Sequence, residues 1–175
     1  MRIEDINDIT SETGIIATLI RHPEYSFYSE ELLPNHFSNR QNACMYLALT
    51  ILARENIRQA DAFNIISALH SSDATKRYAD ELDVDELQDF IDISQSVARD
   101  TIEEYKLLVG NVMDMSFRRD TFRELRECER MCLDTNTHEL EQKIYSTLDD
   151  VMMNYTSTTE VPPFSEVVDK CWDEI

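Results

Sequence analysis

The sequence predicts an all-α protein: a compact orthogonal helical bundle, then a long antiparallel helical hairpin and a short last helix. Turn-breaking residues are scarce, with two glycines and four prolines among 175 residues. Leucine, alanine, glutamate and arginine, which favour helices, are frequent. Apolar residues recur at helical spacing between capping signals, and this periodicity indicates where each helix lies.

The bundle is expected to begin with two helices. Ser11 is the expected start of the first helix, which should end at His22-Pro23 because a residue before proline disfavours the helical conformation. A short helix should follow through Phe27 and Leu32, ended by Pro34.

Three capping signals predict the rest of the bundle. Residues 38–41 (Ser-Asn-Arg-Gln) have the pattern of a capping box, and they should start a helix that runs to about Glu55. Asp61 is the expected cap of the next helix. Residues 83–86 form a second capping box, before a helix that ends the bundle near Val97.

Residues 101–155 predict a helical hairpin. A capping box at residues 101–104 precedes a stretch without a strong breaker until about Asp134, which predicts a helix of roughly 30 residues. A short polar turn then separates it from a helix that ends at about Tyr155. Apolar residues recur along both helices, namely Ile102, Tyr105, Val109 and Val112 on the first and Leu140, Ile144, Leu148 and Val151 on the second.

Residues 156–175 form the third expected part, after the bundle (1–100) and the hairpin (101–155). A polar, proline-stiffened linker precedes a short helix that Ser165 would cap. Its apolar face needs a cover, either on its own bundle or on another subunit. That face consists of Phe164, Val167, Val168, Cys171 and Trp172.

Charge and glycine content exclude several functions. Acidic residues outnumber basic ones 35 to 16, so the net charge is −19, and a surface this negative repels a phosphate backbone. Gly14 and Gly110 lie far apart, so neither a Walker A loop nor a dinucleotide-binding fingerprint occurs. We therefore expect no catalytic residue and no cofactor-binding residue in this segment.

The composition predicts a cytoplasmic protein. No apolar run approaches the roughly 18 residues of a membrane span, and the N-terminus lacks the pattern of a secretory signal, so we expect no membrane partner. The four cysteines have irregular spacing, which favours reduced thiols over a disulfide framework.

Cys128, Cys132 and His138 are candidate metal ligands. The two cysteines lie one helical turn apart, but closely paired zinc ligands on turns are missing. No histidine has a glutamate three positions before it, as a di-iron bundle requires. We expect no metal site, and interpret both thiols as small buried apolar side chains.

A row of arginines allows two interpretations. Arg119, Arg123, Arg126 and Arg130 follow helical spacing and could form a docking strip for an acidic partner. They could equally form a solvated face that Asp120, Glu124 and Glu127 neutralise. The second interpretation is favoured because surface ion pairs are common and weak.

The order of these patterns resembles the N-terminal domain of DnaB-type replicative DNA helicases. The likeness rests on residues 11–20 (SETGIIATLI), 33–37 (LPNHF), 45–52 (MYLALTIL), 61–69 and 102–105 (IEEY), and it extends from Ser11 to the linker. One departure is that residues 76–82 stand where the family has a glycine-containing turn.

The resemblance implies a non-catalytic module for DNA replication. In that family, N-terminal domains pair through their hairpins, and three pairs form a collar on a hexameric ring. The hairpin residues named above would divide between packing within the hairpin and dimer contacts, and the last helix would be a linker helix on the motor domain of a neighbouring subunit. Primase and a helicase loader would dock on the collar. ATP and magnesium would belong to an ATPase domain absent from this segment, and DNA would be reached only through the parent hexamer.

Two other functions remain open. One is a stand-alone replication adaptor of the same fold, from a phage or plasmid, that binds a host helicase. The other is a small enzyme or metal-dependent protein built on a helical bundle, for which no acid–base or ligand constellation is present.

Overall fold

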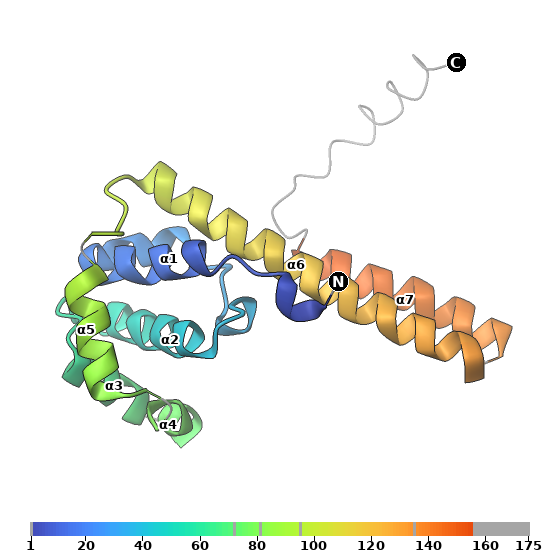
Figure 1. The fold of residues 1–175 in the computed structure, drawn as a ribbon, viewed down its shortest axis with the longest axis horizontal. Helices are drawn as coiled ribbons and strands as arrows, with labels where there is room; N and C mark the ends of the chain where they lie inside the picture. Colours follow the sequence, from blue (N-terminus) through green and yellow to red (C-terminus); the bar gives the residue numbers. More distant parts are fainter. Residues whose placement is uncertain (1, 72, 81, 95, 135, 156–175) are drawn as a thin grey trace, which may run out of the picture. The chain divides into compact units, whose positions relative to one another are not determined.

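The regular structure consists of α-helices and short 3-10 helices, with no strand among the described residues (Figure 1). The computed structural model describes residues 2–71, 73–80, 82–94, 96–134 and 136–155. The all-α prediction is confirmed. None of the helices in these ranges is long and apolar enough to cross a membrane.

The chain forms two compact units, and the division between them falls within the longest helix. The first unit is Met1–Arg123, and the second begins at Glu124. The first unit contains the bundle together with the greater part of α6 (Ile102–Asp134).

Helix α1 (Ile9–Arg21) begins earlier than predicted. Asp8 is its N-cap and accepts a hydrogen bond of 3.0 Å from the Ser11 backbone N–H. The Ser11 hydroxyl also donates to Asp8, at 2.6 Å, so Ser11 lies inside the first turn and the prediction that it starts the helix is wrong. The helix ends before Pro23, as predicted.

Helix α2 (Arg40–Arg54) follows two 3-10 helices, η2 (Pro23–Tyr28) and η3 (Pro34–His36). Its N-cap is Asn39, which accepts a hydrogen bond from the Asn42 N–H. The predicted Ser38 cap is wrong, because both the backbone N–H and the hydroxyl of Ser38 donate to the Glu12 carboxylate.

The rest of the bundle consists of α3 (Ala62–His70), α4 (Asp73–Ala79) and α5 (Val84–Ser94). Asp61 and Asp83 accept hydrogen bonds from the first-turn amides of α3 and α5, as predicted. Helix α4 was not predicted from the sequence. Helix α5 packs against both α1 and α3.

The long helix and the hairpin turn agree with the prediction. Helix α6 has 33 residues, and Thr101 caps its first turn through the Glu104 N–H at 3.3 Å. Asn136 caps the 19-residue helix α7 (Thr137–Tyr155). In the second unit, the end of α6 and α7 lie side by side as a hairpin (Figure 1).

The first part of α6 lies close along α1, at Gly14. A Cβ atom added there would lie 2.9 Å from the Leu108 Cδ1 atom. Asn111 also donates a hydrogen bond to the Ser11 hydroxyl, at 3.1 Å. The buried core of this unit therefore includes residues of α6 as well as of α1, α2, α3 and α5, among them Ile15, Leu19, Leu49, Leu52, Ile65, Leu69, Leu87, Tyr105 and Val112.

The buried side chain of His36 stabilises the segment before α2. The His36 Nδ1 atom accepts a hydrogen bond of 3.1 Å from the Leu33 N–H, while Arg119 donates to the carbonyls of His36 and Ile6. Burial holds the pKa of His36 below its ordinary value of 6.5; the charge of Asp120 opposes this shift and that of Arg119 adds to it. The neutral imidazole is thus the form that fits the fold.

This histidine should make stability depend on pH. Because the folded pKa is lowered, the unfolded chain takes up a proton first as the pH falls. We expect the contribution of His36 to be complete above pH 6.5 and to be lost as the pH falls below that value through its folded pKa. The measurement is the free energy of unfolding in urea between pH 7.5 and pH 5, a range chosen to bracket the ordinary histidine value.

His36→Asn keeps an acceptor near the Leu33 N–H but cannot be protonated, so it should remove part of this pH dependence. His138→Asn is the control, because His138 is exposed on α7. Equal slopes for the wild type and His36→Asn would contradict the assignment.

Candidate functional site

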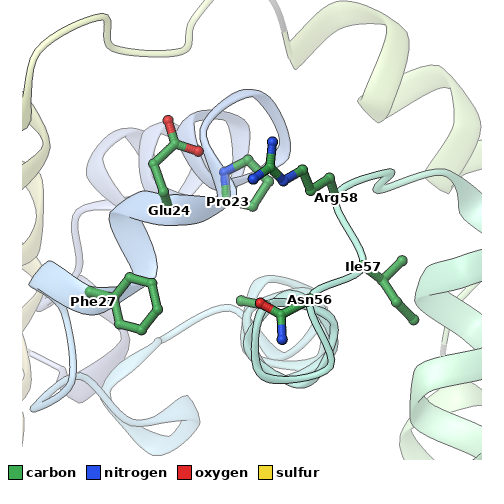
Figure 2. A pocket seen from close by; sticks show the side chains of 7 residues that line it. Pro23, Glu24, Phe27, Asn56, Ile57 and Arg58 are labelled. Carbon is green, nitrogen blue, oxygen red and sulfur yellow. The ribbon is translucent and has the colours of Figure 1, made fainter.

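An apolar groove runs along α2 in the first unit. It has a volume of about 770 Å³ and lies between α2 and the segment from η2 to Pro34. A smaller hollow of about 320 Å³ continues it beyond the end of α2, and Phe27, Ala53 and Asn56 line both (Figure 2). The α2 side is lined by Tyr46, Leu47, Thr50, Ile51, Ala53 and Arg54.

Buried hydroxyl groups hold the two walls of the groove together. The Tyr46 hydroxyl lies 3.0 Å from the carbonyl oxygens of both Ser29 and Leu32. The Tyr105 hydroxyl donates to the Ser29 Oγ atom at 2.8 Å. Burial raises the pKa of both phenols, so they remain protonated and can donate. The groove is thus preformed rather than assembled by a ligand.

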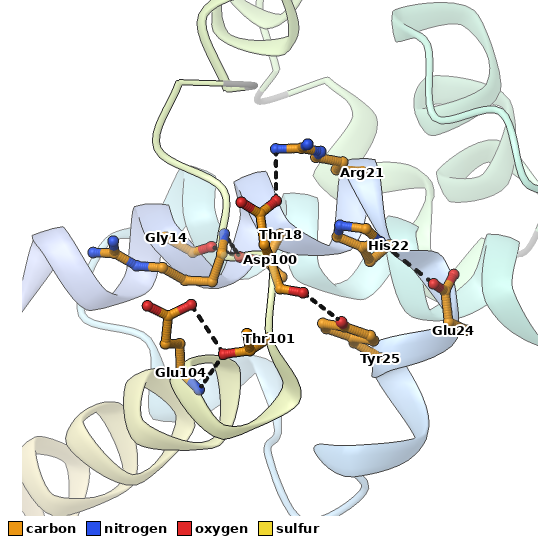
Figure 3. Close-up of polar contacts among 10 residues, drawn as sticks. Gly14, Thr18, Arg21, His22, Glu24, Tyr25, Asp100, Thr101 and Glu104 are labelled. Atoms are coloured by element: carbon orange, nitrogen blue, oxygen red, sulfur yellow. Dashed lines mark hydrogen bonds and ion pairs between the residues drawn. The ribbon is translucent and has the colours of Figure 1, made fainter.

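The η2 wall is also fixed from the opposite side. The Tyr25 hydroxyl donates to the Asp100 carbonyl at 3.0 Å, and Arg21 forms an ion pair of 3.0 Å with the Asp100 carboxylate (Figure 3). The Thr18 hydroxyl accepts from the Arg99 N–H at 2.9 Å. The connection before α6 is therefore attached both to α1 and to η2.

A left-handed residue shapes the far end of the groove. Asn56 has a φ of 58°, and its N–H bonds the Ala53 carbonyl while the Ile57 N–H bonds the Leu52 carbonyl. This is the Schellman pattern of a helix end. This helix end directs the following chain so that Ile57 lines the hollow, which Phe27 of η2 also lines (Figure 2).

The groove and its hollow expose apolar side chains beside charges of both signs, Glu24, Glu30, Arg54 and Arg58. Phe27 is 70% exposed and Leu33 is 51% exposed. Arg54 and Arg58 are exposed on the groove, and neither has an ion pair among the described residues, in a chain of net charge −19. Such a surface suits the binding of a helix.

No model of a known protein family matches the chain, and neither does any curated protein.

The predicted hairpin residues have different surroundings in the two units. Tyr105 and Val112 are buried in the core of the first unit, where Val109 packs against that core. Ile102 is half-buried, as are Leu140 and Ile144 on α7, whereas Val151 is buried; the side chain of Leu148 lies outside the described residues. Their role as dimer contacts stays a prediction.

Sequence periodicity missed other apolar residues that the hairpin exposes. Tyr145 is 68% exposed and Met152 is 50% exposed, and they lie seven residues apart on α7. Met153 is exposed as well. The sequence signal for these residues is that they are apolar although they lie beside the main apolar stripe, at positions where an isolated surface helix would carry charged residues.

The predicted linker-helix residues lie outside the described part of the chain. These are Phe164, Val167, Val168, Cys171 and Trp172.

The arginine row is not a continuous exposed strip. Arg119 is buried and donates to backbone carbonyls. Arg123 pairs with Asp120 at 2.7 Å and Arg130 with Glu127 at 3.0 Å, as the solvated-face interpretation expects. Arg126 pairs with Glu129, at 3.1 Å.

The two hairpin cysteines differ in exposure. Cys128 is buried, as interpreted from the sequence, but Cys132 is exposed, so the interpretation of both as buried is wrong for Cys132. Among the described residues, no group of three or more histidine, cysteine or acidic side chains is placed to hold a metal ion.

Proposed function

We propose that this chain is a non-catalytic oligomerisation and docking module of DNA replication, the N-terminal collar domain of a DnaB-type replicative helicase. The observation that carries the proposal is the order of elements: a compact helical bundle, the 33-residue helix α6, a short turn and the 19-residue helix α7. This order agrees with the resemblance of the sequence to that family. We place the protein in the cytoplasm.

Exposed apolar residues on the hairpin support self-association. Tyr145 and Met152 lie two turns apart on α7, so they share one face, and both are at least half exposed. Met153 and Leu125 add exposed apolar surface on the same hairpin. Neighbouring apolar side chains of this size on a protein surface are typical of a contact surface.

The partners follow from the same proposal. The module pairs with itself, from dimer to hexamer, and receives primase and a helicase loader. ATP and magnesium act in the ATPase domain of the parent helicase, since the two distant glycines of this chain form no nucleotide loop. DNA is contacted only through the parent hexamer, in keeping with a net charge of −19.

The test is the mass of the chain in solution, measured by light scattering and sedimentation over a wide concentration range. The double variant Tyr145→Glu/Met152→Glu should raise the dimer dissociation constant by roughly 100-fold or more, because central interface residues each contribute about 2 kcal/mol or more. Ser146→Glu/Asn154→Glu is the matched control, with the same added charge at exposed positions of α7. A wild-type chain that stays monomeric at high micromolar concentration would overturn the pairing.

The gene beyond the codon for Ile175 tests the parent helicase. A frame that continues into a strand and a Gly-x-x-x-x-Gly-Lys-Ser/Thr loop supports the collar domain. A stop codon there instead favours the stand-alone adaptor that binds a host helicase.

A further inference from the structure

A small pocket lies where the beginning of α5 meets the beginning of α2. We call it the α5 pocket, and its α5 side consists of Leu82, Asp83, Glu86, Leu87 and Phe90. Gln41 on α2 donates a hydrogen bond of 3.4 Å to the Glu86 carboxylate, which joins the two sides. Met45 of α2 and Leu87 are 4% and 3% exposed, so core residues form its floor. Its volume of about 110 Å³ admits one long side chain and not a whole helix.

The charge around the α5 pocket has one sign. Asp83 and Glu86 are the charged residues that line it, and Asp89 lies three residues after Glu86 on the same side of α5. None of these three carboxylates has an ion pair among the described residues. The basic residues nearest in the sequence do not line the pocket; they are Arg40, Lys76 and Arg77. The pocket therefore favours a positively charged occupant.

An exposed apolar side chain extends this surface along α5. Ile93 is 65% exposed, and it shares one face of the helix with Glu86 and Phe90, at the spacing i, i+4 and i+7. This face is about 10 Å long. A small cation would leave Ile93 in water, and the carboxylates repel the phosphates of nucleic acid or of an anionic membrane. Apolar and acidic side chains together select a protein segment that is both basic and amphipathic.

We propose that the α5 pocket binds a lysine or arginine side chain of a basic, amphipathic helix from a partner protein. The aliphatic stem of that side chain packs on Leu82 and Phe90, and its charged end reaches Glu86. Apolar residues of the partner helix cover Ile93. The inference gives the chemistry of a docking partner, but it does not rest on the proposed helicase, because it uses only residues of the bundle.

The probe for this proposal is a labelled synthetic helix of leucine and lysine, about 15 residues long. Fluorescence anisotropy measures its dissociation constant from the full chain at about 0.15 M salt. Glu86→Gln/Asp89→Asn should raise this constant roughly tenfold, because each of two exposed charge pairs contributes a few-fold. Ile93→Ser should raise it several-fold, since it removes apolar contact from an exposed position that the fold does not need.

Asp85→Asn/Asp92→Asn is the matched control. It removes the same charge from exposed positions of α5 that do not line the pocket and are turned about 100° or more from Glu86 around the helix axis. Circular dichroism of each variant verifies that the helices remain formed. The proposal is overturned if the wild-type chain does not bind the probe at high micromolar concentration, if the control weakens binding as much as Glu86→Gln/Asp89→Asn, or if a probe with glutamate in place of lysine binds equally well.

A second probe tests the pocket apart from the surface charge. Diaminopropionic acid in place of lysine keeps an amino group but lacks most of the aliphatic stem. This probe should bind the wild-type chain several-fold more weakly than the lysine probe, because it cannot fill the apolar pocket. Equal affinity of the two probes would show that no side chain enters the pocket.

The hairpin variant Tyr145→Glu/Met152→Glu separates this inference from the proposed function. It should change the mass of the assembly and leave the affinity for the lysine probe unchanged. Conversely, Glu86→Gln/Asp89→Asn should lower the affinity for the probe and leave the mass unchanged.

Discussion

Glu12→Ala is expected to lower the free energy of unfolding by about 3–5 kcal/mol, because it removes a buried acceptor and leaves several donors unpaired. The Glu12 side chain is 1% exposed. One carboxylate oxygen accepts from the N–H and the hydroxyl of Ser38, both at 2.6 Å. The other accepts from the Asn39 N–H at 3.1 Å and from the Asn42 side chain at 3.2 Å.

The position of the Glu12 carboxylate adds to the expected loss of stability. It lies at the first turn of α2, where the helix dipole favours negative charge. Glu12→Gln should also destabilise, by about 2–3 kcal/mol, since its amide nitrogen would face donors instead of accepting from them. Urea unfolding followed by circular dichroism measures both variants.

Glu31→Ala is the control for loss of an acidic side chain, because Glu31 is exposed and lies outside the helices. It should change stability by less than about 0.5 kcal/mol. If Glu12→Ala has an effect as small as Glu31→Ala, then Glu12 does not hold α1 against the start of α2.

The same substitution at the two glycines should have opposite effects. Gly14→Leu is expected to destabilise by about 2–3 kcal/mol, because even a Cβ atom would meet Leu108 at 2.9 Å and the larger side chain would force α1 away from α6. Gly110→Leu should stabilise by about 0.8 kcal/mol, since nothing lies within 4 Å of its added Cβ and leucine favours a helix over glycine.

Thermal and urea unfolding of the two variants measure this difference. Gly14→Ala is the intermediate case: the contacting atom is the far end of a flexible leucine side chain, so its destabilisation should be smaller than that of Gly14→Leu. Stabilisation by both leucine substitutions would show that α1 and α6 do not pack tightly at Gly14.

Local patterns predicted the long helices well. The cap at Thr101 and the absence of a breaker until Asp134 gave the length of α6, because both are properties of neighbouring residues. The prediction that Ser38 caps α2 was wrong because it depended on a residue far away in the chain. Ser38 donates to the carboxylate of Glu12, 26 residues earlier, and only the packing of α1 against α2 brings the two residues together.

The surfaces were harder to predict than the helices. Periodicity identified Tyr105 and Val112 as apolar-stripe residues, but it does not say whether the bundle or a partner covers that stripe. The groove combines Leu33, Ile51 and Ile57 from separate segments, so no sequence pattern contains it. Asn56 offered one local clue, since asparagine after a helix end favours the left-handed conformation.

The attachment of residues 99 and 100 has a mechanical consequence. The bonds from Arg99 to Thr18, and from Asp100 to Arg21 and Tyr25, tie the start of α6 to two other elements. Tension applied to the beginning of α6 would therefore pass into α1 and η2 instead of stretching the connection that follows α5. Since η2 forms a wall of the groove, a pull at this point is transmitted directly to the surface where a helix would bind.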